Sequence, residues 1–281
     1  MLLDGKLVKS ESLKELKIKY RDINTGLAVI EIGDDFASNR YIKQKEKLAK
    51  ELDVKFKLIK QATATTEELV SIIDKLNNNY NIDGIIVQLP LPKNIDYDII
   101  RNRINPNKDI DGVNDTNRIA LIDNCNNALI PCTALGVMKI IDFYNIDVSG
   151  KDVVIIGRSI HIGKALYNLL LNRDATVTIC HSKTKDLKKY TKQADIIITS
   201  VGKANLITQD MIKDDVCLID VGFNYLNGKI CGDVSHDVVR YKYLTPVPGG
   251  VGQMTVYSIF ENLYKAYNLN KQNTISTTKI N

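Results

Sequence analysis

A lysine in the segment SNRYIKQKEKLA, residues 38–49, falls where a helix would normally bury apolar side chains. At about 100° per residue, Lys45 shares a face with Ile42 and follows Tyr41 by one turn. The neighbouring lysines lie on the opposite face: Lys43, Lys47 and Lys50. Burial lowers the pKa of an amine, so we expect Lys45 to exchange protons nearer neutrality than a surface lysine. The competing interpretation is that its stem covers apolar surface while the ammonium group reaches water.

Three further segments carry polar groups or glycines at positions suited to a ligand. Gln88 stands in the run GIIVQLPLP, and open α/β sheets bind ligands at the carboxyl ends of their strands. In KDIDG, Asp109 and Asp111 are two residues apart, so an extended segment directs both carboxylates to one side. The segment TPVPGGVGQMT, 245–255, is a stiff loop that can lie close against a ligand. Singly, each also fits a structural role, as a capping residue, a turn-forming pair or a plain loop.

The second half of the chain contains a turn typical of dinucleotide-binding domains. In VVIIGRSIHIG, Gly157 ends an apolar strand and Gly163 begins a helix, whose N-terminus would hold a pyrophosphate. The turn lacks the central glycine of the common G-x-G-x-x-G pattern, so alone it is a weak signal. After the next strand, CHSKT offers Ser182 and Lys183 where NAD enzymes carry an acid, and Arg158 follows the first glycine. Two cations and a hydroxyl suit a 2′-phosphate and favour NADP over NAD.

Composition excludes several classes of protein. The chain has 281 residues, 44% hydrophobic and 25% charged, with a net charge of +5, which is ordinary for a globular protein. It lacks both a basic run with interleaved aromatics and a long apolar segment, so we expect no binding to nucleic acid or membrane and a cytoplasmic location. Five widely spaced cysteines and three scattered histidines predict neither disulfides nor a metal site. Cys132 and Cys180 are interpreted as small buried residues.

Strand-like and helix-like runs alternate, which predicts an α/β fold with mainly parallel sheets covered by helices on both faces. The expected strands are 27–33, 54–60, 84–92, 152–157, 175–180, 194–200 and 216–222. The expected helices are the segment around Lys45, 65–76, 137–145, 163–172 and 254–268. Residues 93–133 are rich in Asn, Asp and Pro and are expected to form a long irregular connection that carries function.

Taken together, the motifs resemble the bifunctional methylenetetrahydrofolate dehydrogenase/methenyltetrahydrofolate cyclohydrolase family. They are S-x-x-Y-x-x-x-K, V-Q-L-P-L-P, K-D-x-D-G, P-C-T, G-R-S, C-H-S-K-T and T-P-V-P-G-G-V-G-x-M-T, in this order over nearly the whole chain. The resemblance implies an α/β substrate domain and a Rossmann-like NADP-binding domain with a cleft between them, usually in a homodimer. The corresponding boundaries are 1–122 with the helix 253–269 for the folate domain, 123–252 for the NADP domain, and a disordered tail at 270–281.

The resemblance also implies a function and a set of site residues. The enzyme would oxidise 5,10-methylenetetrahydrofolate with NADP⁺ and hydrolyse the methenyl product to 10-formyltetrahydrofolate, in one-carbon metabolism and purine biosynthesis. The implied catalytic residues are Lys45, Gln88 and Asp111, and the implied substrate-binding residues are Tyr41, Ser38, Asp111, Pro248, Gly249, Gly250 and Gln253. The implied cofactor-binding residues are Thr133, Gly157, Arg158, Ser159, Gly163, Ser182, Lys183, Val201, Gly202, Asp220, Gly222, Gly252 and Thr255.

Departures from the family pattern leave alternatives open. The family's usual proline before Met-Thr is Gln253, and two further usual prolines are replaced by Ala134 and Ala165. One alternative is therefore a dehydrogenase without cyclohydrolase activity. Another is a different NADP-dependent oxidoreductase, which gives no reason for V-Q-L-P-L-P or the Tyr41/Lys45 pair. The last is a catalytically silent nucleotide-binding or scaffold protein, whose signature would be the loss of Lys45 or Asp111, and both are present.

Overall fold

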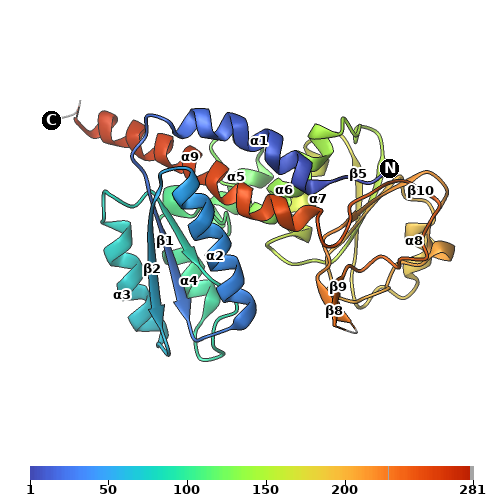
Figure 1. Ribbon diagram of the computed structural model, residues 1–281, viewed down its shortest axis with the longest axis horizontal. Coiled ribbons are helices and arrows are strands. Elements are labelled where there is room, and N and C mark those ends of the chain that lie inside the picture. The colour runs from blue at the N-terminus through green and yellow to red at the C-terminus, as the bar shows by residue number, and fades with distance from the viewer. Residues whose placement is uncertain (227, 279–281) are drawn as a thin grey trace. The chain divides into compact units, whose positions relative to one another are not determined.

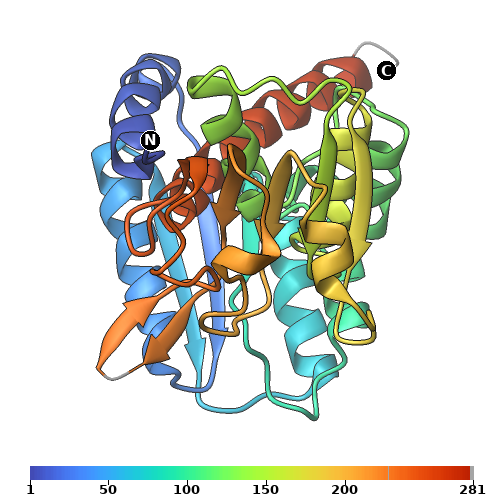
Figure 2. The ribbon, with the colours of Figure 1, turned by 90° about the vertical axis from the view of Figure 1, so that its right-hand side faces the viewer.

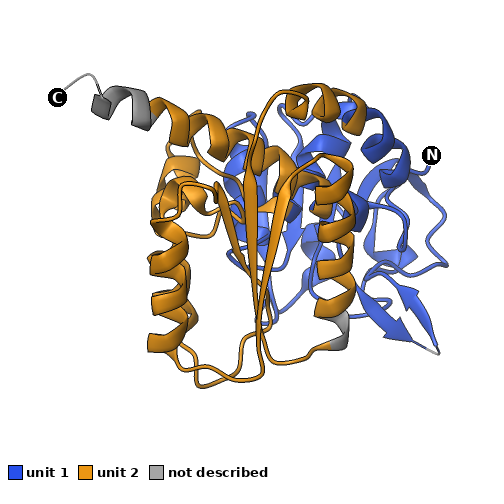
Figure 3. Ribbon diagram, turned by 60° about the vertical axis from the view of Figure 1, so that its left-hand side comes forward, with its two compact units in different colours: residues 1–12, 133–255 blue, residues 13–132, 256–281 orange. Residues whose placement is uncertain are grey.

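The computed structural model describes residues 1–226 and 228–278, in a chain that divides into two compact units (Figures 1 and 3). Unit 1 comprises residues 1–12 and 133–255, and unit 2 comprises residues 13–132 and 256–281. The two-domain α/β class expected from the sequence is confirmed.

Unit 2 is built on a three-stranded parallel sheet. Its strands are β1 (Gly26–Ile32), β2 (Lys55–Gln61) and β3 (Gly84–Val87), in the order β2-β1-β3. All seven residues of the central strand β1 are buried, as expected for a strand with both faces covered. Figure 3 shows helices on both sides of this sheet.

Helices cover both faces of the unit 2 sheet (Figure 3). They are α1 (Gly5–Tyr20), α2 (Phe36–Glu51), α3 (Thr66–Asn77), α4 (Tyr97–Arg103), the 3-10 turn η1 (Pro106–Lys108), α5 (Asp115–Ile122) and α9 (Val251–Thr278). Both α1 and α9 begin in unit 1. Apolar residues of β1, α3 and α4 form one continuous core, including Ile30, Leu69 and Ile100. The start of α3 is fixed by a capping box in which Glu68 N–H donates to Thr65 Oγ1 and Thr65 N–H donates to Glu68 Oε2.

Unit 1 holds a five-stranded parallel sheet. Its strands are β4 (Asp152–Ile156), β5 (Thr176–Cys180), β6 (Ile196–Thr199), β7 (Val216–Asp220) and β10 (Tyr241–Leu244), in the order β10-β7-β6-β4-β5. Counted within the unit, the strand order is 2-1-3-4-5, so the topology reverses between β4 and β6. In doubly wound sheets, ligands bind at the carboxyl ends of the strands beside this switch point.

The remaining elements of unit 1 frame that sheet. They are α6 (Cys132–Phe143), α7 (Gly163–Leu171), α8 (Leu187–Thr191), the 3-10 turn η2 (Gln209–Met211) and the hairpin of β8 (Asn224–Leu226) and β9 (Lys229–Cys231). The hairpin extends away from the sheet (Figure 2). The first residues of the chain lie along β10, where Leu2 forms a parallel bridge with Leu244 and Leu3 N–H donates to the Leu244 carbonyl.

The structure differs from the sequence prediction at several elements. The stretch 93–133, expected to be irregular, contains α4, η1 and α5, and α1, α8, β8, β9 and β10 were not predicted at all. Strand β3 ends at Val87, before the prolines, whereas the prediction continued it to residue 92. Helix α9 runs to Thr278, into the segment expected to be a disordered tail from residue 270; residues 279–281 of that tail lie outside the described residues.

The unit boundaries also differ from those expected. Residues 1–12 group with unit 1 because backbone hydrogen bonds tie Leu3 to Leu244 and Gly5 to Gly249. Residues 123–132 group with unit 2, where the Asn117 side chain accepts from Leu129 N–H and the Asn262 side chain donates to the Ile130 carbonyl.

Candidate active site and cofactor site

Lys45 is buried on α2, whereas the lysines around it are exposed. Its exposed fraction is 6%, and Lys43 and Lys47 on the same helix face solvent, as the periodicity predicted. Burial lowers the pKa of Lys45 below its usual value, although the negative charge of Asp111 and the thiol of Cys132 act in the opposite direction. Lys45 therefore has the lowered proton affinity that the sequence analysis expected.

The amide of Gln88 holds the Lys45 amine. Lys45 Nζ donates to Gln88 Oε1 over 2.7 Å, and Gln88 Nε2 donates to the Leu89 carbonyl over 2.9 Å, which fixes the orientation of the amide. Ser38 Oγ donates to the same carbonyl over 3.1 Å. Ser38 lies in the first turn of α2, where its N–H donates to the capping side chain of Asp35. Tyr41, half-buried, stands on α2 one turn before Lys45.

Asp111 lies in a tight turn between η1 and α5. Gly112 N–H donates to the Asp109 carbonyl over 2.9 Å, and Gly112 adopts φ +68°. A Cβ on Gly112 would lie 2.5 Å from the Ile130 carbonyl carbon, so only glycine lets the two segments approach this closely. The charge of Asp111 acts on both Lys45 and Cys132, so the turn brings this carboxylate into the electrostatic surroundings of the lysine.

Asp109, the other acid of KDIDG, is completely buried. Its Oδ2 accepts from Asn114 N–H over 2.7 Å and from Asn117 Nδ2 over 3.0 Å, and its Oδ1 has no hydrogen-bond partner among the described residues. Burial raises the pKa of Asp109 to about 7, an effect only partly offset by the Asn114, Asn117 and Val113 amide groups. Sequence reasoning paired Asp109 with Asp111, yet the structure gives Asp109 the interior position.

Two residues that the sequence analysis did not assign to the site border it. Cys132 Sγ donates to the Ile110 carbonyl over 3.1 Å, and burial followed by the charge of Asp111 raises the pKa of the thiol well above its usual value. Asn262 of α9 donates to the carbonyls of Ile110 and Ile130 over 2.8 and 2.7 Å, and so joins the two segments on either side of Gly112. In the sequence, Asn262 could have been noticed as a polar residue within an apolar helix, between Phe260 and Leu263, which are both buried.

The turn after β4 in unit 1 has the geometry of a pyrophosphate site. Gly157 adopts φ +123°, and a Cβ on Gly163 would lie 2.0 Å from the Gly157 carbonyl oxygen. Ser159 is exposed, and its Oγ accepts from Ile162 N–H over 3.3 Å, immediately before α7 begins at Gly163. The backbone can therefore approach an anion closely at the start of this helix.

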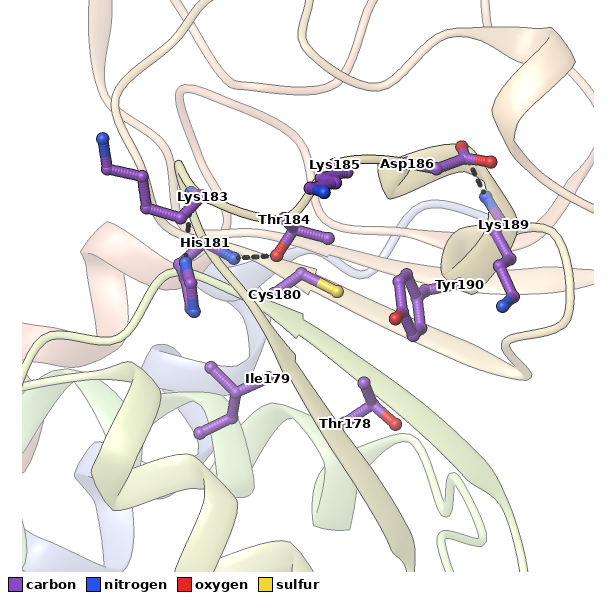
Figure 4. Close-up of a pocket in the computed structure, with 10 residues that line it drawn as sticks. All are labelled: Thr178, Ile179, Cys180, His181, Lys183, Thr184, Lys185, Asp186, Lys189 and Tyr190. Atoms are coloured by element: carbon purple, nitrogen blue, oxygen red, sulfur yellow. Dashed lines mark hydrogen bonds between the residues drawn. The ribbon is translucent and has the colours of Figure 1, made fainter.

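A cationic cavity of about 510 Å³ lies at the carboxyl end of β5 (Figure 4). It is lined by Thr178, Ile179, Cys180, His181, Lys183, Thr184, Lys185, Asp186, Lys189 and Tyr190. His181 Nδ1 accepts from Lys183 N–H over 3.1 Å, and His181 N–H donates to Thr184 Oγ1 over 2.9 Å, which orders the loop (Figure 4). Arg158 and Ser182 are exposed, so their side chains are accessible to an anionic ligand.

Asp220, expected to bind cofactor, instead uses both carboxylate oxygens on backbone groups. Oδ1 accepts from Gly222 N–H and Asp233 N–H, and Oδ2 accepts from Val234 N–H, over 2.8 to 3.0 Å. Burial raises the pKa of Asp220 to about 6, assisted by the charge of Asp233 and opposed by these three N–H groups. This geometry favours a supporting position for Asp220 over direct contact with a ligand.

The expected site residues divide between the two units. Lys45, Gln88, Ser38, Tyr41 and Asp111 all belong to unit 2. Every expected cofactor-binding residue belongs to unit 1, as do four of the expected substrate-binding residues, Pro248, Gly249, Gly250 and Gln253.

Three parts of that unit 1 set have defined local surroundings. Thr133 Oγ1 and Thr255 Oγ1 lie 3.4 Å apart, and Gly252 is exposed with open space at its Cβ position. Gln253 N–H donates to the Gly250 carbonyl, and its side chain is half-buried.

The described residues contain neither a metal site nor a membrane-spanning helix. Residues 1–226 and 228–278 contain no group of three or more His, Cys, Asp or Glu side chains that could hold a metal ion. In that same part of the chain, no helix combines the length and apolar character needed to cross a bilayer. Cys132 and Cys180 are buried free thiols, as interpreted from the sequence.

Comparisons with known proteins cover both units. Residues 3–111 match the catalytic domain, and residues 131–271 the NAD(P)-binding domain, of the tetrahydrofolate dehydrogenase/cyclohydrolase family. The chain is 46% identical over 274 residues to the bifunctional protein FolD of Campylobacter jejuni strain RM1221, covering 94% of this chain and 97% of that one.

Two solved structures show the same architecture. The bifunctional FolD methylenetetrahydrofolate dehydrogenase/cyclohydrolase of Campylobacter jejuni has a TM-score of 0.93 at 43% identity, with 96% of this chain and 99% of that chain covered. The FolD enzyme of Trypanosoma brucei, solved with NADP cofactor and an inhibitor, has a TM-score of 0.89 at 31% identity, with 96% and 98% covered.

Proposed function

The chain belongs to the tetrahydrofolate dehydrogenase/cyclohydrolase family, and from that premise we propose that it carries out both reactions of the family. It oxidises 5,10-methylenetetrahydrofolate with NADP⁺ to the 5,10-methenyl cation, and it hydrolyses this cation to 10-formyltetrahydrofolate. The observation that carries the proposal is the buried Lys45 amine, with its lowered pKa, hydrogen-bonded to the neutral side chain of Gln88. A neutral amine beside the methenyl cation can accept a proton and does not repel the substrate.

The hydrolytic step needs a group that both accepts and returns a proton. Water attacks the bridge carbon of the methenyl cation, and Lys45 takes the proton that the attacking oxygen loses. Lys45 then returns a proton to N5 as the bond between N5 and the bridge carbon breaks. The remaining hydroxyl proton is released to water, which leaves the formyl group on N10 and one proton in solution overall. The hydrogen bond to Gln88 Oε1 keeps the amine in one place during this exchange.

Folate recognition falls to the residues around the lysine. The Asp111 carboxylate is an acceptor for the amino and ring N–H groups of the pterin, and Tyr41 offers an aromatic face to the aminobenzoate ring. Ser38 lies within the same hydrogen-bonded group, through the Leu89 carbonyl that it shares with Gln88. The segment of Pro248, Gly249, Gly250 and Gln253 supplies further substrate contacts from unit 1.

Unit 1 has the features that an NADP site requires. When bound, NADP⁺ accepts the hydride that leaves the one-carbon bridge. Gly157 and Gly163 admit the pyrophosphate, and Arg158, Ser182 and Lys183 bind the 2′-phosphate. The cationic cavity beside Lys183 supports NADP over NAD because a carboxylate at this position would repel the phosphate. The remaining contacts come from Thr133, Ser159, Val201, Gly202, Gly222, Gly252 and Thr255.

We extend the proposal to the assembly and setting of the enzyme. Two copies form a homodimer through unit 1, whose edge strand β5 offers unpaired N–H and C=O groups for association. The enzyme works in the cytoplasm, and its product supplies formyl groups for purine biosynthesis.

Exchange of Lys45 for methionine tests the proposal, with Lys43→Met as the matched control on the same helix. Lys45→Met keeps a long apolar stem but removes the amine, so hydrolysis of 5,10-methenyltetrahydrofolate should fall at least about a hundredfold. Lys43 is exposed, and its variant should retain wild-type hydrolysis. Absorbance of the methenyl compound reports hydrolysis, and reduced cofactor reports the dehydrogenase reaction with NADP⁺ or NAD⁺.

The outcomes separate the candidate functions. Full hydrolysis by Lys45→Met would refute the acid–base role. A wild-type enzyme that reduces NADP⁺ without hydrolysing the methenyl compound would be a dehydrogenase alone, which the Gln253 substitution leaves open.

A further inference from the structure

The loop that follows β6 stands beside the switch point of the unit 1 sheet. It comprises Ser200 to Lys203 and contains Val201 and Gly202, two residues assigned above to cofactor binding. A loop at the carboxyl end of this strand faces the place where doubly wound sheets hold their ligands. Its position therefore affects how a dinucleotide fits.

Asp233, which follows β9 in the chain, is completely buried and holds this loop through its side chain. Its Oδ2 accepts from Val201 N–H over 2.8 Å and from Thr199 Oγ1 over 2.9 Å. Its Oδ1 accepts from Lys203 N–H over 2.8 Å and from Asn224 Nδ2 over 3.0 Å. Two of these four donors are backbone groups of the loop itself.

Glycines make room for the carboxylate in this interior position. A Cβ on Gly222 would lie 2.3 Å from Asp233 Oδ1, and a Cβ on Gly232 would lie 1.9 Å from Asp220 Oδ2. Asp220 in turn accepts from the N–H of Asp233, so the two acids and the two glycines form one closely packed group. A side chain at either glycine position would displace a carboxylate.

The loop held by Asp233 rests on the pyrophosphate turn. A Cβ on Gly157 would lie 2.6 Å from Ser200 Oγ and 3.4 Å from a methyl group of Val201. Ser200 N–H also donates to the carbonyl of Ile156, the last residue of β4. Movement of the loop would therefore move the surface on which the dinucleotide is bound.

We propose that Asp233 is a positioning residue for the cofactor: it fixes the loop Ser200–Lys203 against the Gly157 turn and so prearranges the NADP site. The inference rests on the proposed function, because that function assigns the loop to NADP. Asp233 acts through the loop, because its side chain accepts from Val201 N–H and Lys203 N–H. Its contribution is that the loop is already ordered when the cofactor arrives, which lowers the entropy lost on binding.

Asp233→Asn is the sharpest test because it keeps the size of the side chain. An amide NH₂ in place of either oxygen would face a backbone N–H donor, so one loop amide loses its acceptor. Loss of one hydrogen bond to a charged group should raise the NADP KM and Kd at least about tenfold. Hydrolysis of the methenyl compound uses no cofactor and should stay within about twofold of wild type, because Lys45, Gln88 and Asp111 belong to unit 2 and Asp233 to unit 1.

Asn224→Ala is the matched control, since it removes a donor to Asp233 on the hairpin side and leaves both loop amides bonded. Its NADP KM should stay within about twofold of wild type. A purely structural role for Asp233 predicts instead that both activities and the melting temperature of Asp233→Asn fall together. Unchanged NADP affinity in a folded Asp233→Asn enzyme would likewise overturn the proposal.

A second pair keeps the test decisive if Asp233→Asn does not fold. Thr199→Val removes the hydroxyl that donates to Asp233 Oδ2 at nearly constant volume, whereas Thr199→Ser keeps a hydroxyl at this position. The valine variant should raise the NADP KM a few-fold and the serine variant should not, whereas equal values in the two variants contradict the proposal. Absence of both reactions in the wild-type enzyme would refute the proposed function itself, a result distinct from any of these.

Discussion

Two buried aspartates, one in each unit, hold turns that carry binding residues, and they differ in how completely they are bonded. Asp233 in unit 1 receives four hydrogen bonds, two at each oxygen. Asp109 in unit 2 receives two at Oδ2, and its Oδ1 is unpartnered among the described residues. Both side chains are 0% exposed, so burial does not explain the difference.

A buried acid with donors at both oxygens can hold a loop in one place, whereas a buried acid with one oxygen unbonded can also take up a proton there. Each oxygen of Asp233 accepts two hydrogen bonds, so the side chain and the loop bonded to it are held in one conformation. A loop that binds a dinucleotide benefits from such a fixed conformation. The spare oxygen of Asp109 can carry a proton, and the pKa of about 7 places that proton exchange near neutrality. The turn that carries Asp111 therefore contains a group, Asp109, whose charge changes near pH 7.

The largest loss of stability is expected from a substitution in the turn that contains Asp109 and Gly112. Gly112 and Gly150 adopt nearly the same φ, +68° and +67°, but a Cβ would meet the backbone of another segment at Gly112 and open space at Gly150. Gly150→Ala should cost about 1 kcal/mol for its conformation, and Gly112→Ala about 3 kcal/mol or more because the Ile130 backbone must move. Urea unfolding measures both, and equal losses would show that packing does not control this turn.

An intermediate effect concerns the proton of Asp109. Because its pKa is raised to about 7, the folded state keeps a proton that the unfolded chain releases near pH 4. The free energy of unfolding should therefore fall as pH rises from about 4 to about 7. Asp109→Asn should flatten this part of the stability profile. An unchanged slope in the variant would assign the pH dependence to other groups.

The smallest effect is expected at Asp220, beside Asp233. Burial raises the pKa of Asp220 only to about 6, so the corresponding decline in stability should end near pH 6. Asp220→Asn should flatten the profile between about pH 4 and 6 and leave the slope from 6 to 7 intact. Comparison of the two variants by thermal melts across pH distinguishes the two acids, and a loss of slope above pH 6 in Asp220→Asn would contradict this assignment.

Local patterns in the sequence predicted most of the sheet and the central lysine. Apolar runs located the buried strands, and the 3.6-residue period placed Lys45 inside and Lys43 outside. The expected helix 65–76 agrees with α3, whose N-cap is Thr65. The resemblance, not periodicity, implied that Lys45 and Gln88 are both catalytic, and the structure joins them by a hydrogen bond across 43 residues of the chain.

The parts that were missed depend on contacts between distant segments or on ambiguous composition. Asp96, Asn105 and Asn114 cap the short helices of the stretch expected to be irregular, and the same residue types also form loops. Asp233 binds a loop 30 residues before it, and Asn262 binds a carbonyl 152 residues before it. No local period marks such a residue, because its role is set by what the fold brings beside it.

The first residues of the chain have a consequence for handling the protein. Leu2 and Leu3 occupy one side of β10 by pairing with Leu244, so this margin of the five-stranded sheet is covered by the chain's own backbone. Proteolytic trimming of these few residues would leave a row of unpaired N–H and C=O groups along β10. Such a row can accept a strand from another molecule, so a small loss of chain at this point would favour aggregation.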